Sequence, residues 1–287
     1  DSPLGSTSSC TVSAVGRLGS FPSYTLMGAA LEAVRGLSNM VACWPLRDSG
    51  SPAEAAFGTI LLKDNGGDGW GLGPLLPMDE GTDPHPSFVG ASGKLQLSNT
   101  SLNIPQPWTV WITVPSEPSD GTTLLRLNKP SSPYFAGAGA TDLTWTKADG
   151  FGLGNGLAST VLGPSSSWPQ LVAISQNSSF TLIDRWSADG SHMSSSIFLI
   201  GNLKSIVVNP VLTGSKVFSA GYLTITAGLT SEGAALAAAL LSTRSVSLAG
   251  GPIEWLATRA GVTSLTGTPT DSVLPNLDGR TAADALS

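Results

Sequence analysis

The residues of this sequence best suited to holding a ligand lie in a short acidic, glycine-rich stretch. KDNGGDGWG, which begins at residue 63, brings Asp64, Asn65 and Asp68 together within five positions. Carboxylate and amide oxygens are the ligands that Ca²⁺ prefers, so these three side chains form a candidate calcium site. An EF-hand is excluded because glycine stands at the third loop position and leucine at the twelfth. A metal-free acidic loop is the competing interpretation.

The same loop, which extends to residue 90, also offers an aromatic side chain. The indole of Trp70 could stack on the apolar face of a sugar ring, while carboxylates could accept hydrogen bonds from its hydroxyls. Trp70, Asp64, Asp68 and Asp79 are therefore candidate ligand-binding residues. The alternative is that Trp70 folds back onto the body of the protein and contributes only to packing.

Catalytic constellations are not evident in the sequence. His85 in DPHPSF and His192 in GSHMSS both have turn-like neighbours, and we expect each to be a solvated loop histidine. The glutamates are scattered, and no dense acidic strand motif supplies the paired carboxylates of a glycosidase. GFGLGNG (150–156) lacks the strand–helix context of a nucleotide loop, so we interpret it as a long turn. We predict no catalytic residue and no enzymatic activity.

Composition points to a chain rich in strands and turns. Of 287 residues, 41% are hydrophobic and only 12% charged, with 34 glycines and 20 prolines. The net charge of −6 and the lack of a Lys/Arg cluster argue against nucleic acid as a partner. The longest apolar run, within 233–241, is far too short to span a membrane. Cys10 and Cys43 are either two buried thiols or one long-range disulfide.

The middle of the chain predicts a series of short strands separated by Gly, Ser, Asn and Pro. WTVWITV (108–114) alternates clearly, and further strands are predicted at 122–127, 142–146, 169–175, 179–184, 195–201, 205–209 and 221–228. This pattern predicts an all-β fold, an antiparallel jelly-roll sandwich of two sheets. The side chains expected to point inward are Trp108, Val110, Ile112, Val114, Leu171, Ala173, Leu182 and Ile225.

The two ends of the chain have a different character. A strand at 10–15 and a helix at 26–36, ended by Gly36, precede the sandwich. A helix from Thr230 to Ser242 closes it, and a second helix is predicted at 252–261. We therefore divide the chain into an N-terminal scaffold segment (1–37), the sandwich with its closing helix (38–243) and a helical C-terminal scaffold segment (244–287). The last residues resemble an interrupted helix, so we expect the protein to continue beyond them.

Four segments of the middle region resemble the concanavalin A-like, laminin G-like sandwich family. They are CWPLRDSGS (43–51), ASGKLQLSN (91–99), WTVWITV (108–114) and WPQLVAISQNSSFTLIDRWSADG (168–190). GYLTITAGLTSEGAALAAALL (221–241) resembles the last strand and the short helix that often follows it. The resemblance implies that Trp44-Pro45 starts a strand at the edge of the sandwich, where proline does not break a ladder. Laminin G-like domains sometimes bind calcium, which agrees with the candidate site above.

The flanks resemble minor tail proteins of phages of actinobacteria. The similar segments are VSAVGRLGSF (12–21) before the sandwich, and GGPIEWLATRAGV (250–262) with LPNLDGRTAADAL (274–286) after it. In those proteins the sandwich interrupts a tail-hub scaffold. This chain departs from the family pattern at Gly16, where the junction strand usually carries Asp.

The resemblance implies a structural component of the tail tip of a virion. Other phage tail proteins and a host cell-wall glycan are the expected partners, and a homotrimer is the expected assembly. No cofactor is expected apart from the calcium ion considered above. The alternative is a secreted carbohydrate-binding lectin or glycoside hydrolase of the same fold.

Overall fold

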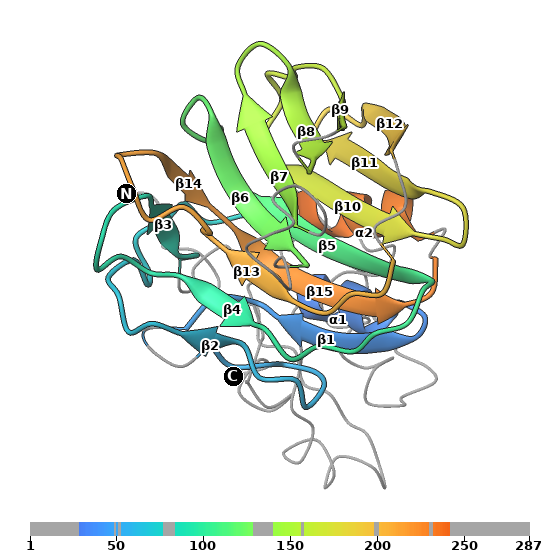
Figure 1. The fold of residues 1–287 in the computed structure, drawn as a ribbon, viewed down its shortest axis with the longest axis horizontal. Helices are drawn as coiled ribbons and strands as arrows, with labels where there is room; N and C mark the ends of the chain where they lie inside the picture. The colour runs from blue at the N-terminus through green and yellow to red at the C-terminus, as the bar shows by residue number, and fades with distance from the viewer. Residues whose placement is uncertain are drawn as a thin grey trace, which may run out of the picture. The chain divides into compact units, whose positions relative to one another are not determined.

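Figure 1 shows the computed structural model, in which strands account for most of the elements. The structure describes residues 29–241 apart from 49, 51–52, 77–83, 129–139, 156–157, 198–200 and 230–231. The predicted strand at 10–15, the helix at 252–261 and Cys10 lie outside the described residues. Within the described part, the named strands pair antiparallel in two large sheets and one small one.

The first sheet has six strands in the order β1-β15-β5-β10-β11-β12. Their bounds are β1 Met40–Trp44, β15 Gly221–Ala227, β5 Trp108–Val114, β10 Gln170–Gln176, β11 Thr181–Ser187 and β12 His192–Ile197. All seven residues of β5 and of β10 are buried, because both strands lie in the interior of the sheet and are covered on both faces.

The second sheet has seven strands in the order β2-β4-β13-β6-β7-β8-β9. Their bounds are β2 Lys63–Asp64, β4 Leu97–Asn99, β13 Ile206–Val208, β6 Thr122–Leu127, β7 Thr141–Thr146, β8 Gly150–Gly154 and β9 Ser159–Val161. A separate two-stranded sheet pairs β14 (Val217–Ser219) with β3 (Ser87–Val89). The predicted all-β antiparallel sandwich is confirmed.

The core lies between the two large sheets. One cluster of buried side chains combines β5 residues such as Val110 with β6 residues such as Leu125 and β8 residues such as Phe151. Trp44 and Trp108 are completely buried in this cluster. Each buried Leu, Ile, Val or Phe side chain contributes about 1.5–3 kcal/mol relative to an exposed one, so this cluster is the main source of stability.

Three of the predicted inward-facing residues do not face the core. Leu171 and Ala173 pair with Thr113 and Trp111 across β10 and β5, which places them on the outer face of the six-stranded sheet. They are buried, but the core is filled by their neighbours Val172 and Ile174. The prediction for Leu182 is wrong in the same way, because Leu182 is only half-buried and Ile183 faces the core. The strands are apolar on both faces, so alternation alone does not distinguish the faces.

Two other local predictions are wrong. Trp44 is the last residue of β1 and Pro45 follows the strand, so the pair ends a strand rather than starting one, although β1 does lie at the edge of its sheet. GFGLGNG was expected to be a turn, but its first five residues form β8, whose Phe151 and Leu153 face the core. Apolar residues that alternate with glycine satisfy the two-residue period of a strand as well as any other alternation does.

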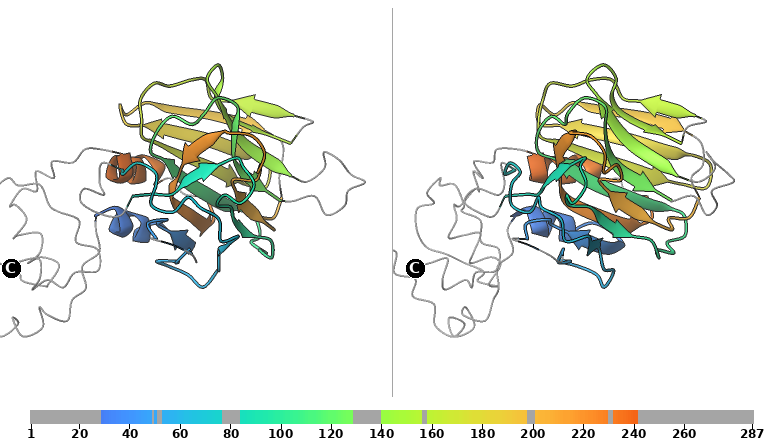
Figure 2. Two further views of the ribbon diagram at one scale, coloured as in Figure 1. Left: turned by 90° about the vertical axis from the view of Figure 1, so that its left-hand side faces the viewer. Right: turned by 60° about the vertical axis from the view of Figure 1, so that its left-hand side comes forward.

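Two short helices lie side by side next to the sandwich (Figure 2). Helix α1 (Ala29–Arg35) contacts α2 (Gly233–Leu241), and Glu232 accepts hydrogen bonds from the backbone N and the Oγ of Ser38 at 3.0 and 2.8 Å. Helix α2 packs on β10 and β11, where Gly233 lies directly against the ring of Trp186. The predicted closing helix is therefore present and covers the outer face of the six-stranded sheet. The division at residues 37 and 243 remains a prediction.

The thiol of Cys43 is free and completely buried in β1. Burial raises the pKa of Cys43 to about 12, so the thiol is protonated at neutral pH. No helix in the described residues is long and apolar enough to cross a membrane.

Candidate functional site

The predicted acidic loop uses its polar groups to hold its own backbone. Asp64 Oδ1 accepts a hydrogen bond from Gly66 N at 2.9 Å, which closes a tight turn. Asn65 Oδ1 accepts from the backbone N–H of Gly67 at 3.1 Å and of Gln96 at 3.0 Å. The Asn65 amide also donates to the carbonyl oxygen of Lys94 at 2.8 Å. These bonds fasten the loop to the segment before β4.

The candidate calcium ligands are engaged with protein groups. The Asn65 side-chain oxygen points at two N–H donors, and the Asp68 carboxylate forms an ion pair with Lys94 at 3.2 Å. In the described part of the chain, no group of three or more His, Cys, Asp or Glu side chains could hold a metal ion. Calcium at Asp64, Asn65 and Asp68 therefore stays a prediction.

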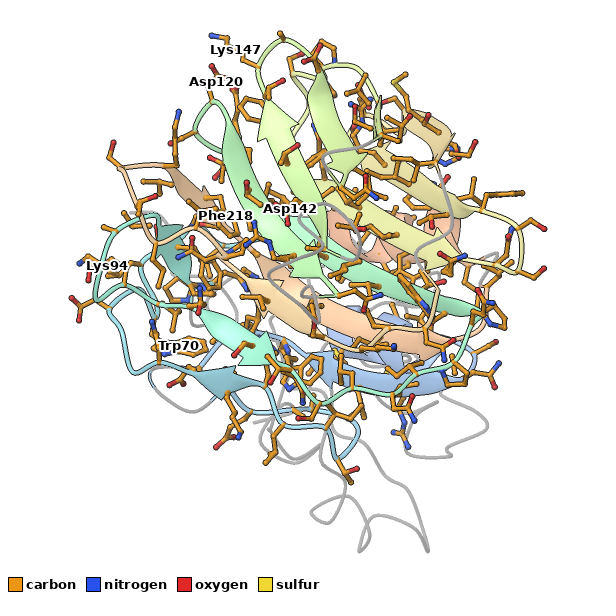
Figure 3. The ribbon with its side chains drawn as sticks, in the orientation of Figure 1. Trp70, Lys94, Asp120, Asp142, Lys147 and Phe218 are labelled. Atoms are coloured by element: carbon orange, nitrogen blue, oxygen red, sulfur yellow. The ribbon has the colours of Figure 1, made fainter. Side chains whose placement is uncertain are left out.

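Trp70 is half-buried and packs against the hydrophobic core. Its Nε1 is buried. Figure 3 shows Trp70 and Lys94 toward the side of the molecule that holds β2 and β3, well apart from Asp142. Asp79, the remaining predicted ligand-binding residue, lies outside the described residues. The predicted sugar-binding role of this loop is not tested by its geometry.

The two histidines have quite different surroundings. His85 is completely buried, and its Nδ1 lies 3.3 Å from the carbonyl oxygen of Leu46. Its ring fills the space above Gly221, where a Cβ would lie only 2.4 Å away. The prediction of a solvated loop histidine is wrong here, because the glycine in β15 creates a slot that the imidazole occupies.

His192 is exposed, as expected, but it lies on strand β12 rather than in a turn. Its ring stacks on Trp186 with the centroids 4.7 Å apart, and its Nε2 lies 3.0 Å from Asp184 Oδ1. The described contacts of His85 and His192 include no nucleophilic side chain in a catalytic arrangement.

A hollow of about 340 Å³ lies over β7, β8 and β9 on the outer face of the seven-stranded sheet. We call it the β7–β9 groove; it is lined by Asp142, Thr144, Thr146, Asp149, Gly150, Gly152, Leu153, Gly154, Ser159, Thr160 and Val161. The outward positions of β7 carry Asp142, Thr144 and Thr146, which pair across the ladder with Gly154, Gly152 and Gly150. Every outward position of β8 is thus a glycine. The backbone of Gly163 occupies the side-chain space of Gly150, whereas Gly152 and Gly154 leave the floor of the groove open.

The groove has one polar wall and one mixed wall. β7 contributes a carboxylate and two hydroxyls, whereas β9 contributes Ser159 and the half-exposed apolar side chain of Val161. A Cβ added at Gly152 would lie 3.3 Å from Thr144 Oγ1 and 3.4 Å from Val161 Cγ1. A single side chain at that position would therefore fill the space between the walls.

The carboxylate of Asp142 is fixed by Arg126 on the neighbouring strand β6. Arg126 Nε and Nη2 each donate to one carboxylate oxygen at 2.7 Å, and both side chains are about one-third exposed, at 34% and 28%. These hydrogen bonds raise the pKa of Arg126. At the end of the groove, Thr146 Oγ1 donates to Asp149 Oδ2 at 3.3 Å and accepts from Asp149 N at 3.0 Å. The polar wall is therefore held in place before any ligand arrives.

None of the groove residues was predicted from the sequence as a binding residue. The available signal was the alternation in GFGLG, where glycine stands at every second position of a strand. Glycine inside a strand often marks a place where a ligand or another backbone comes close. That signal was missed because the segment was interpreted as a turn.

The sequence matches no protein-family model and no curated protein. Solved structures with a similar fold include the enzymatically active domain of tailspike protein 2 from bacteriophage CBA120, with a TM-score of 0.38, 12% identity and coverage of 54% of this chain and 28% of that one. For the binding domain of botulinum neurotoxin serotype D/C the TM-score is 0.45, with 12% identity and coverage of 70% of this chain and 51% of that one. For Trypanosoma rangeli sialidase the TM-score is 0.46, with 12% identity and coverage of 71% of this chain and 33% of that one. This chain thus spans about half or less of their length, and the likeness concerns the β-sandwich fold alone.

Proposed function

We propose that the β7–β9 groove binds a glycan and that the chain is a structural minor tail protein whose sandwich attaches a phage tail to the host cell surface. The observation that carries the proposal is the stripe of glycines between two rows of side chains. It leaves a shallow trough along β8 that is narrow at Gly152, so a sugar lying across it can contact both walls at once.

The chemistry of the two walls matches the two sides of a sugar ring. Hydroxyls of a pyranose or furanose can donate to the carboxylates of Asp142 and Asp149 and exchange hydrogen bonds with Thr144. Val161 offers an apolar surface to the C–H groups of the ring. Hydrogen bonds to charged acceptors are about twice as strong as neutral ones, so the polar wall would fix the orientation of the sugar.

The tail assignment rests on the resemblance of residues 12–21, 250–262 and 274–286 to minor tail proteins. A shallow groove without a stacked aromatic ring binds weakly by itself. Several copies on one tail tip raise the overall affinity, because the second binding event becomes intramolecular. A homotrimer on the virion, in contact with other tail proteins and with a host cell-wall glycan, is the assembly that this function favours.

We propose that the chain is not an enzyme, in contrast to the alternative of a glycoside hydrolase. A hydrolase needs a carboxylic acid that donates a proton and a second carboxylate placed across the bond. Both oxygens of Asp142 accept hydrogen bonds from Arg126, which is the arrangement of a structural ion pair. The alternative of a secreted lectin shares the groove and differs in its assembly.

Binding of the fluorescently labelled chain to a glycan microarray tests the proposal. We expect binding to a restricted set of glycans, without release of new reducing ends during incubation. Gly152→Val fills the floor and should weaken binding about tenfold or more, comparable to the effect of a misfitting methylene. The matched control is Ser98→Val on β4, an outward position of the same sheet outside the groove. Equal loss in both variants, or no loss in Gly152→Val, contradicts the proposal.

A further inference from the structure

We infer that the β7–β9 groove selects neutral glycans over anionic ones, and that the ion pair between Arg126 and Asp142 sets this selectivity. This inference rests on the proposed function and names the ligand class of the same site. It follows from where the charges of the groove lie and from which of them are already paired.

Among the described residues that line the groove are two carboxylates, Asp142 and Asp149, and no Lys, Arg or His. Arg126 is the cation with described contacts to the lining, and the Nε and Nη2 groups of its guanidinium fork donate to the Asp142 carboxylate. Lys147 lies in the turn between β7 and β8 and is not part of the lining (Figure 3). Two carboxylates against one guanidinium leave the described part of the groove with one net negative charge.

An anionic sugar would meet repulsion in this groove. The carboxylate of a uronic or sialic acid, or a phosphate on the glycan, would be brought close to Asp149, and the described lining residues include no Lys, Arg or His to bind it. Placing like charges together in an interface costs several kcal/mol. Hydroxyls of a neutral sugar have the opposite effect, since they donate to both carboxylates in charge-assisted hydrogen bonds.

Arg126 would become an anion receptor if Asp142 lost its charge. A guanidinium presents N–H donors in a planar fork that matches carboxylate and phosphate oxygens in a bidentate manner. In this protein the Nε and Nη2 edge of the guanidinium is engaged by Asp142 at 2.7 Å for both bonds. Asp142 therefore does two things: it offers acceptors to the groove, and it occupies the edge of Arg126 that would otherwise bind an anionic ligand.

The test compares the full chain with Asp142→Asn on one microarray that carries neutral glycans and matched glycans with uronic acid, sialic acid or phosphate. For the wild-type chain we expect signals on neutral glycans and none on their anionic counterparts. Asp142→Asn keeps the size of the side chain but removes its charge. It should weaken neutral binding by about tenfold, because hydrogen bonds to a charged acceptor become bonds to a neutral one, and it should raise anionic binding by a similar factor.

Two further variants separate the effect from a general change of charge or from misfolding. Arg126→Met leaves Asp142 charged and removes the fork, so anionic glycans should stay excluded while neutral binding remains. Asp68→Asn makes the same change of charge at the ion pair with Lys94, outside the groove, where the Asp68 side chain is 80% exposed. This variant should leave the ratio of neutral to anionic binding unaltered. Circular dichroism of each variant is the control measurement for folding.

The possible outcomes distinguish this inference from the proposed function. If Gly152→Val abolishes binding but Asp142→Asn leaves the neutral-to-anionic ratio unchanged, the groove binds glycans and the inference is wrong. Binding of anionic glycans by Arg126→Met also contradicts it. Equal binding of anionic and neutral glycans by the wild-type chain also overturns it. Absence of binding to every glycan overturns both the inference and the proposed function.

Discussion

The described first part of the acidic loop (63–76) and the β7–β9 groove contain similar polar residues but use them differently. In the loop, Asp64 and Asn65 accept hydrogen bonds from backbone N–H groups and tie one segment to the next. In the groove, the polar side chains stand on a regular sheet whose ladder already satisfies the backbone. Gly152 and Gly154, their partners on β8, have no side chains, so space remains for a ligand. The lack of side chains on the β8 glycines is as important for this candidate site as the polar side chains of β7.

This difference predicts opposite consequences of substitution in the two regions. A change in the loop should alter the free energy of unfolding and leave glycan binding intact. A change in the groove should weaken binding with little effect on stability. The contrast is wrong if substitutions in one region change both stability and binding. It is also wrong if loop substitutions weaken binding while groove substitutions lower stability.

The largest effect on stability is expected for Trp70→Ala. The indole packs on the core and is half-buried, so its removal should lower the free energy of unfolding by about 2 kcal/mol, less than the 3–5 kcal/mol for a fully buried Trp. Chemical denaturation measures this loss, and the glycan microarray should show unchanged binding. Unchanged stability with lost binding, or with reduced adsorption of phage to cells, would instead restore Trp70 as a sugar platform.

The all-β sandwich follows from the sequence because strand periodicity and turn residues are local signals. β5 and β6 have the predicted bounds, 108–114 and 122–127. Which side chains of β10 point to the core does not follow from the sequence. Leu171, Val172, Ala173 and Ile174 are all apolar, and both faces of this strand are covered. Only the register with β5 decides which residues reach the core, and register depends on distant segments.

The candidate site was harder to predict for a related reason. Sequence reasoning looks for side chains that carry chemistry, and it found them in the loop. The groove depends on Gly150, Gly152 and Gly154 standing opposite Thr146, Thr144 and Asp142, and this alignment exists only once β7 and β8 pair. The buried position of His85 likewise depends on Gly221, more than a hundred residues away.

A smaller loss of stability is expected for Asn65→Ala. The substitution leaves the N–H groups of Gly67 and Gln96 without their shared acceptor and removes the donor to Lys94. Because the loop is partly solvated, water can replace some of these bonds, and we expect a loss of about 1.5 kcal/mol. Asp68→Asn in the same loop should lose less than about 0.5 kcal/mol, since an exposed ion pair contributes little. Similar losses in both variants would contradict the structural role of Asn65.

Thr144→Val should affect binding and hardly affect stability. Its hydroxyl donates to Gly152 O at a long 3.4 Å, and valine has the same shape and a high strand propensity. Loss of one neutral hydrogen bond to the sugar should weaken binding about three- to tenfold, while the midpoint of thermal unfolding stays the same. Titration calorimetry with a glycan identified on the microarray measures the change. Ser98→Val serves again as the control, and identical affinities of the two variants would remove Thr144 from the site.

The smallest effect is expected for calcium. The oxygens proposed for Ca²⁺ at Asn65 and Asp68 are engaged with two N–H donors and with Lys94, so a cation must displace these partners before it binds. With an affinity weaker than about 10 mM, millimolar Ca²⁺ would stabilise the fold by about 0.1 kcal/mol or less, and the midpoint of thermal unfolding should not move. Mg²⁺ serves as the control for ionic strength. A rise of several degrees in Ca²⁺ alone, abolished by Asp68→Asn, would contradict the expectation. It would also blur the contrast between the two regions, because the loop would then bind a ligand as well as hold its own backbone.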